Sequence, residues 1–128
     1  MADEWVTDYD DTDHEHAKLF DTLRSVRAVV LHCREPVLLA EALDVMRARM
    51  KAHFTVEERE AATTDAEAAD ILRQDHRALL RMVDRMRLLT ATSTAERKVA
   101  MAELFAALQK HDREVDAPLF RLLRQKAA

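Results

Sequence analysis

Four helix-start signals divide the chain into long segments and leave little choice of fold. Three have the form Ser/Thr-x-x-Glu, in which a hydroxyl and a carboxylate bind backbone N–H groups that the first turn of a helix leaves unpaired. These are Thr12 with Glu15, Thr64 with Glu67 and Ser93 with Glu96. The fourth signal is Pro36, whose fixed φ and missing N–H suit a first turn. The signals predict helices over residues 13–34, 36–61, 65–91 and 94–125.

The connections between these predicted helices are short, so consecutive helices should lie side by side and run in opposite directions. Glycine is absent from the chain and proline occurs twice, which favours helix over sheet. We predict an all-α fold: an up-down-up-down antiparallel four-helix bundle, forming a single domain over residues 1–128. A short N-terminal arm carrying Trp5 and Tyr9 is expected to cover one end of the bundle.

The charge pattern and the cysteine count exclude several classes of protein. A net charge of -4, with basic and acidic residues mixed throughout, gives no basic surface for nucleic acid. Cys33 is the only cysteine, so no internal disulfide is expected. No apolar run approaches the roughly 20 residues that span a bilayer, and the acidic start does not resemble a signal peptide. We expect a soluble cytoplasmic protein with no membrane or nucleic-acid partner. Its oligomeric state stays open.

An apolar stripe at helical spacing runs along each predicted helix, and four histidines fall on these stripes. The stripe of the last helix is expected to include Val115 and Leu122. The four histidines are His16, His53, His76 and His111, one on each helix. In the predicted topology all four lie in the same half of the bundle core. His14 and His32 do not share this placement and are expected at the surface.

Two carboxylates accompany these histidines. Glu57 follows His53 by four residues, just over one helical turn, so both side chains leave the same face. Because a buried carboxylate without a partner is costly, something must satisfy Glu57. The inward histidines and Asp116 can do so together if they bind metal. The sequence therefore predicts a joint metal site made of His16, His53, Glu57, His76, His111 and Asp116.

The composition of this set indicates which metals it suits. Four imidazoles and two carboxylates are too many for one structural zinc ion, which takes four ligands. They suit two ions about 3.5 to 4 Å apart with carboxylates between them. Nitrogen and oxygen ligands accept iron, zinc or copper, so ligand type leaves the metal open. The Glu-x-x-His pair of ferritin-like sites and the Cys-x-x-Cys-His of c-type haem are both missing.

Four segments in order resemble those of the hemerythrin family: TDHEHAKLF, HFTVEE, QDH and HDREVD. The resemblance covers essentially the whole chain. It implies a non-haem centre of two Fe ions with an oxo or hydroxo bridge, which binds O₂ or a related small ligand such as peroxide or nitric oxide. In that centre Glu57 and Asp116 would bridge the irons. His16 and His53 would bind one iron, and His76 and His111 the other.

The sequence departs from the family pattern on its third helix. The family has a further histidine four residues before the one that matches His76, and this chain has Leu72 there. The second iron would therefore lose a ligand. We expect the open position to favour reaction with O₂ or peroxide over reversible carriage.

A second departure concerns the step from His111 to Asp116. Five residues turn an ideal helix by about 140°, so Asp116 would not lie in line with His111. Glu114 is the rival ligand, and Asp112 is the least favoured. We favour Asp116 because the family spacing matches it, and we expect Pro118 to bend the helix and bring it inward.

Three functional hypotheses follow. The first is a di-iron protein that binds O₂ as a carrier, store or sensor. The second is a di-iron enzyme, an oxidase, an oxygenase or a peroxide-consuming enzyme, which uses the position opened by Leu72. The third is a helical interaction module with structural histidines. The sequence does not decide whether the protein is an enzyme.

Overall fold

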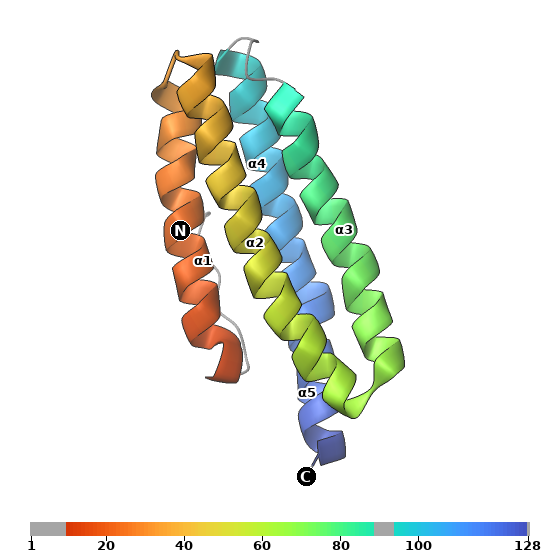
Figure 1. Ribbon diagram of the computed structural model, residues 1–128. Helices are drawn as coiled ribbons and strands as arrows, with labels where there is room; N and C mark the ends of the chain where they lie inside the picture. The colour runs from red at the N-terminus through yellow and green to blue at the C-terminus, as the bar shows by residue number, and fades with distance from the viewer. Residues whose placement is uncertain (1–9, 89–93, 128) are drawn as a thin grey trace.

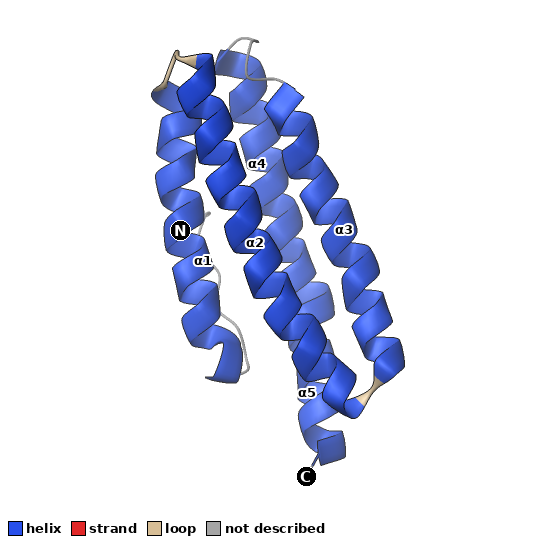
Figure 2. Cartoon of the chain, viewed as in Figure 1, coloured by secondary structure: helices blue, strands red, loops and turns tan. Residues whose placement is uncertain are grey.

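The computed structural model describes residues 10–88 and 94–127, and within these ranges the chain is helical without any strand (Figure 2). The all-α prediction is therefore confirmed. The elements are α1 (Asp10–His32), α2 (Pro36–Thr64), α3 (Ala66–Leu88), α4 (Thr94–His111), the π-helical turn η1 (Asp112–Asp116) and α5 (Ala117–Ala127). Each of the four predicted helical segments is present.

The helices pack side by side along their lengths. In Figure 1 each of α2, α3 and α4 runs opposite to the helix before it, and α5 continues the line of α4. Contacts join α1 to α2, α2 to α3, α3 to α4, and α4 back to α1, so the four rods enclose one core. Because η1 and α5 extend α4, the fourth rod is a single helical path with a change of winding in it.

The helix starts agree with the sequence signals only in part. Pro36 occupies the first turn of α2, as predicted. Thr64 does not cap α3, because it is the last residue of α2. The carboxylate of Asp65 caps α3 instead, by accepting hydrogen bonds from the backbone N–H groups of Glu67 and Ala68. Thr12 lies inside α1, which already includes residue 10. Ser93 lies outside the described residues, as do Trp5 and Tyr9 of the predicted arm.

The core consists of two apolar clusters with a polar layer between them. Along α2 the order is Phe54 in the larger cluster, Glu57, and then Ala61 in the smaller cluster. Along α3 Leu79 belongs to the larger cluster and Leu72 to the smaller one, with His76 between them. The polar layer is thus one to two helical turns thick, and apolar packing closes it above and below.

The turn η1 changes which face of the fourth rod is buried. Within it the backbone N–H of Ala117 donates to the carbonyl of Asp112, five residues earlier, as in a π-helix. The prediction that Leu122 belongs to the core is wrong: it is 49% exposed, and Phe120 and Leu123 are buried. The extra residue in the wide turn moves the buried positions along the chain by one.

Candidate metal centre

All six predicted site residues lie in the polar layer, and none is more than 6% exposed. Their exposed fractions are 6% for His16, 3% for His53, 0% for Glu57, 1% for His76, 4% for His111 and 2% for Asp116. They come from α1, α2, α3, α4 and η1. Residues up to 100 positions apart in the chain are therefore gathered in one layer of a core that is otherwise apolar.

Glu57 occupies the middle of this layer, and its two carboxylate oxygens face different histidines. Its Oε2 lies 3.3 Å from Nε2 of His16 and 3.4 Å from Nε2 of His53. Its Oε1 lies 3.2 Å from Nε2 of His76. One carboxylate thus separates two groups of imidazole nitrogens.

Asp116 repeats this two-sided arrangement. Its Oδ1 lies 2.7 Å from Nε2 of His111, and its Oδ2 lies 4.0 Å from Nε2 of His16. The Nε2 atoms of His76 and His111 are 3.1 Å apart. The donor atoms therefore form two groups, which share Glu57. One consists of Glu57, His76, His111 and Asp116, and the other of His16, His53 and Glu57, with Asp116 near His16 alone.

The contact between His76 and His111 brings two ring nitrogens together, and it requires a cation when both rings are neutral. Nδ1 of His76 lies 2.8 Å from Oε2 of Glu58, and Nδ1 of His111 contacts Oδ2 of Asp75. When those Nδ1 atoms carry the protons, both Nε2 atoms present lone pairs to each other. Two lone pairs at 3.1 Å repel unless a cation lies between them. A metal ion fits this requirement.

The spacing of the donor atoms also suits metal binding. Two ligands bound at about 2.1 Å and at right angles to each other are about 3.0 Å apart. The contacts just described span 2.7 to 3.4 Å, except that of Asp116 with His16 at 4.0 Å. The donors are nitrogen and carboxylate oxygen without thiolate, which suits iron, manganese, zinc or copper. The residues present therefore fit divalent metal cations.

The carboxylates and imidazoles of the layer shift one another's pKa values. Burial alone would raise the pKa of Glu57, but contacts from three histidines hold it well below the usual range. Burial lowers and the Glu57 contact raises the pKa of His16, with a net rise. Burial likewise opposes ionisation of His111, yet Asp116 raises its pKa to about 9. Burial and the charge of Glu57 raise the pKa of Asp116 to about 7.

Three further carboxylates surround the layer, and the sequence indicated only one of them, Asp112, as a possible ligand. Glu58 contacts His76, Asp75 contacts His111, and Asp112 lies 3.6 Å from Nδ1 of His16. Asp112, the least favoured candidate in the sequence, is 4% exposed. Each is next to a predicted ligand in the sequence: Glu58 follows Glu57, Asp75 precedes His76, and Asp112 follows His111. Each contacts a histidine of a different helix, however, so the pattern within one segment does not indicate these contacts.

The alternatives raised by the sequence are also placed. The side chain of Glu114 is 52% exposed, and its Oε2 lies 4.0 Å from Nζ of Lys110, so it does not join the layer. Leu72 is 0% exposed and packs in the smaller apolar cluster. His32 is exposed, as expected.

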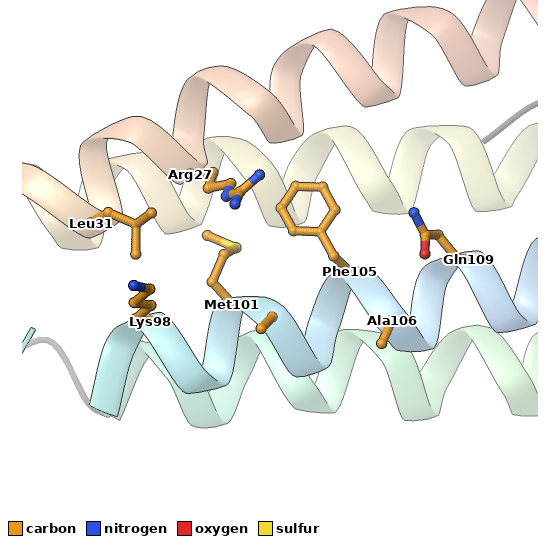
Figure 3. A pocket seen from close by; sticks show the side chains of 8 residues that line it. Arg27, Leu31, Lys98, Met101, Phe105, Ala106 and Gln109 are labelled. Atoms are coloured by element: carbon orange, nitrogen blue, oxygen red, sulfur yellow. The ribbon is translucent and has the colours of Figure 1, made fainter. Parts of the chain in front are cut away.

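Two surface pockets lie beside the fourth rod, and one of them reaches the polar layer. A pocket of about 220 Å³ between α3 and α4 is lined in part by His111 and Asp75. The other, of about 240 Å³, lies between α1 and α4 (Figure 3). Its lining includes Arg27, Met101 and Phe105 and none of the six predicted site residues.

The fold and the layer together define a helical protein with a buried cation-binding cluster. A family model described as the hemerythrin HHE cation binding domain matches residues 7–123. The chain belongs to the hemerythrin HHE cation-binding family. Comparisons with curated proteins and with solved structures gave no match. Among the described helices, none is both long and apolar enough to cross a membrane.

Proposed function

We propose that this chain, as one up-down-up-down bundle over residues 1–128, binds two iron ions and uses them to bind O₂ or a related small ligand. The ligands are His16, His53, Glu57, His76, His111 and Asp116. Glu57 and Asp116 bridge the ions, His16 and His53 hold one, and His76 and His111 hold the other. Oxygen binding, storage or sensing would follow from such a centre.

The observation that carries the proposal is the two-sided placement of Glu57 and Asp116. Each presents one oxygen to a different group of imidazole nitrogens, at 2.7 to 3.4 Å for all contacts except that of Asp116 with His16 at 4.0 Å. A single ion would need only one such group. Two groups that share Glu57, with Asp116 reaching from one group toward His16 of the other, support a dinuclear site.

Iron, when bound, supplies the electrons and the open positions that O₂ binding requires. The chain's own residues set the surroundings. Phe54 stacks on the ring of His76, with 3.9 Å between ring centroids and 7° between planes, and it also contacts His53 and His111 edge-on or tilted. This ring and the two apolar clusters bury the layer, which strengthens the charge interactions inside it.

A di-iron enzyme is the second candidate, and Leu72 is the observation that favours it. Its side chain is buried in the smaller apolar cluster on the His76 side of the layer and offers no donor atom. An ion held by His76 and His111 then has fewer protein ligands than the family pattern gives it. A position open at that ion favours an oxidase, an oxygenase or a peroxide-consuming enzyme.

Metal content tests the common part of both candidates. The protein should be produced in iron-supplemented medium, purified without oxygen, and analysed by elemental mass spectrometry and anomalous scattering at the iron edge. We expect two irons per chain. Less than one metal ion of any kind per chain would favour the third hypothesis, a helical interaction module.

Reversibility separates the two candidates. The reduced, iron-loaded protein is exposed to O₂ and then returned to an oxygen-free atmosphere while its absorption spectrum is recorded. Full return of the initial spectrum over repeated cycles supports a binding protein. Irreversible loss of colour with the appearance of an oxidised product supports an enzyme. A cytoplasmic location also stays a prediction, which fractionation of the source cells would test.

A further inference from the structure

The outward-facing nitrogens of the four histidines are supported unequally. Nδ1 of His76 lies 2.8 Å from Glu58, and Nδ1 of His111 contacts Asp75. By contrast, Nδ1 of His53 is buried and has no hydrogen-bond partner within the described part of the chain. The two imidazoles on the Leu72 side of the layer are thus both backed by carboxylates, and one imidazole on the other side is not.

Glu58 is itself held in place by a chain of charges on the surface of α2 and α3. Its Oε1 lies 3.6 Å from Nε of Arg73, and Nη1 of Arg73 donates to Oδ1 of Asp70 at 2.7 Å. Asp75 has a more open setting, with its side chain 41% exposed beside the pocket between α3 and α4. Both outer carboxylates therefore connect the buried layer to the protein surface.

Such outer carboxylates prepare a histidine for metal binding. A carboxylate at Nδ1 fixes the proton there, leaves the Nε2 lone pair free, and holds the ring in one orientation. The ring of His76 is fixed further by the stack with Phe54. An imidazole without such a partner has to lose tautomeric and rotational freedom when the ion binds, and this loss weakens binding.

We propose that the position between His76 and His111 is the tighter of the two metal positions, and that Glu58 and Asp75 are the positioning residues that make it so. This inference rests on the proposed dinuclear site. It assigns Glu58 and Asp75 the role of offsetting the ligand that Leu72 fails to provide. The position between His16 and His53 is then the second to fill.

Stepwise titration of the metal-free protein with Zn²⁺, a diamagnetic divalent probe, tests the order of filling. Nitrogen-15 spectra of the histidine side chains report each Nε2 atom separately. We expect the first equivalent to shift the signals of His76 and His111, and the second those of His16 and His53. The reverse order overturns this inference while leaving a dinuclear site intact. Failure to bind two equivalents overturns the proposed site itself.

Substitutions of the outer carboxylates test their role in the same titration followed by calorimetry. Glu58→Gln and Asp75→Asn should each lower the affinity for the first equivalent of Zn²⁺ about 10- to 100-fold. The affinity for the second equivalent should stay almost unchanged. Glu114→Gln is the matched control, because Glu114 lies beside the same pocket as Asp75 and is exposed. This variant should leave the affinity for both equivalents unchanged.

A purely structural role for these carboxylates predicts a different result. It would lower the melting temperature of the metal-free variants and weaken both equivalents alike, and that result overturns the inference. The conservative variant Asp75→Glu keeps the carboxylate and should recover most of the first-equivalent affinity. It should also restore the Nδ1 proton signal of His111, which Asp75→Asn is expected to displace.

Discussion

His111 and Asp116 are five residues apart, and yet Nε2 of the first lies 2.7 Å from Oδ1 of the second. In a regular α-helix the two side chains would diverge by about 140°. The π-helical turn over Asp112–Asp116 reduces this divergence, because its N–H groups bond five residues back and its turn is wider. Pro118, placed just after the turn, has no N–H to continue the regular α-helical pattern at that point.

Removing one residue from this turn tests its origin. A π-turn is equivalent to one residue inserted into an α-helix, so deleting the exposed Glu114 should restore an α-helix without rotating α5. Pro118→Ala must accompany the deletion, because a proline inside a regular helix costs about 3 kcal/mol. We expect this variant to fold and to bind two metal ions, as shown by circular dichroism and elemental analysis.

The control for that deletion is removal of the exposed Glu103, which lies in the regular part of α4. There the loss of one residue rotates everything after it by about 100°. His111, Asp116 and α5 would then leave the core. We expect this variant to lose metal and cooperative unfolding, and equal behaviour of the two deletions would contradict the proposed origin of the turn.

Asp116 and its rival Glu114 should differ sharply in their effect on metal content. Asp116 is 2% exposed and faces both groups of imidazoles, whereas the Glu114 side chain is half-exposed beside Lys110. Asp116→Ala should reduce bound metal from two ions to at most one per chain, measured after dialysis against buffer. Glu114→Ala should retain both ions. Retention of two ions by Asp116→Ala would remove this residue from the ligand set.

Leu72→His should add back a ligand at the position between His76 and His111. In the metal-free variant a buried imidazole replaces an apolar side chain, at a cost of about 1 to 3 kcal/mol in the free energy of unfolding. Metal should recover that loss and make the O₂ response more reversible. Thermal unfolding with and without metal, followed by O₂ cycling, measures both effects.

Leu43→His is the matched control for Leu72→His. Leu43 is 2% exposed in the larger apolar cluster, ten residues before His53 on the same helix. The Leu43→His variant should be destabilised to a similar extent with and without metal. If Leu72→His behaves in the same way as this control and binds O₂ as the parent does, the open position has no role in reactivity.

Metal binding should depend on pH, because protons compete for the same atoms. Burial disfavours charged His111, yet the contact with Asp116 raises its pKa to about 9, and burial with the charge of Glu57 raises that of Asp116 to about 7. Both groups therefore hold protons at pH 6 in the metal-free protein and must release them to bind metal. Metal affinity should rise between pH 6 and pH 9, with proton release measurable by calorimetry in two buffers.

The same shifts fix the pH dependence of the metal-free protein's stability. The folded state binds these protons more tightly than the unfolded state, so His111 contributes stability below pH 6.5 that is lost as pH rises through 9. The raised pKa of Asp116 acts with the same sign between pH 4 and pH 7. Glu57, whose pKa is lowered, loses its contribution only in acid. We expect the midpoint of urea unfolding to fall from pH 6 to pH 9, and a rise would contradict these shifts.

The sequence alone determined the helices, the buried face of the first three, and which histidines turn inward. These depend on spacing within one segment, as with His53 and Glu57, where a 3.6-residue period fixes the direction of each side chain. The hemerythrin resemblance added the choice of Asp116 over Glu114, which periodicity by itself did not favour. The helix caps were predicted less well. The pattern indicated Thr64 as the cap of α3, whereas the side chain of Asp65 caps it in the structure.

Tertiary structure decided the rest. The π-turn keeps Ala117, Phe120 and Leu123 packed against Ala61 and Leu72, so the contacts of α5 with α2 and α3 set its register, and Leu122 is left exposed. The outer carboxylates Glu58 and Asp75 meet histidines of other helices, at distances fixed by how the rods are rotated against each other. Periodicity describes one helix at a time, whereas these features arise from the relative rotation and register of packed helices.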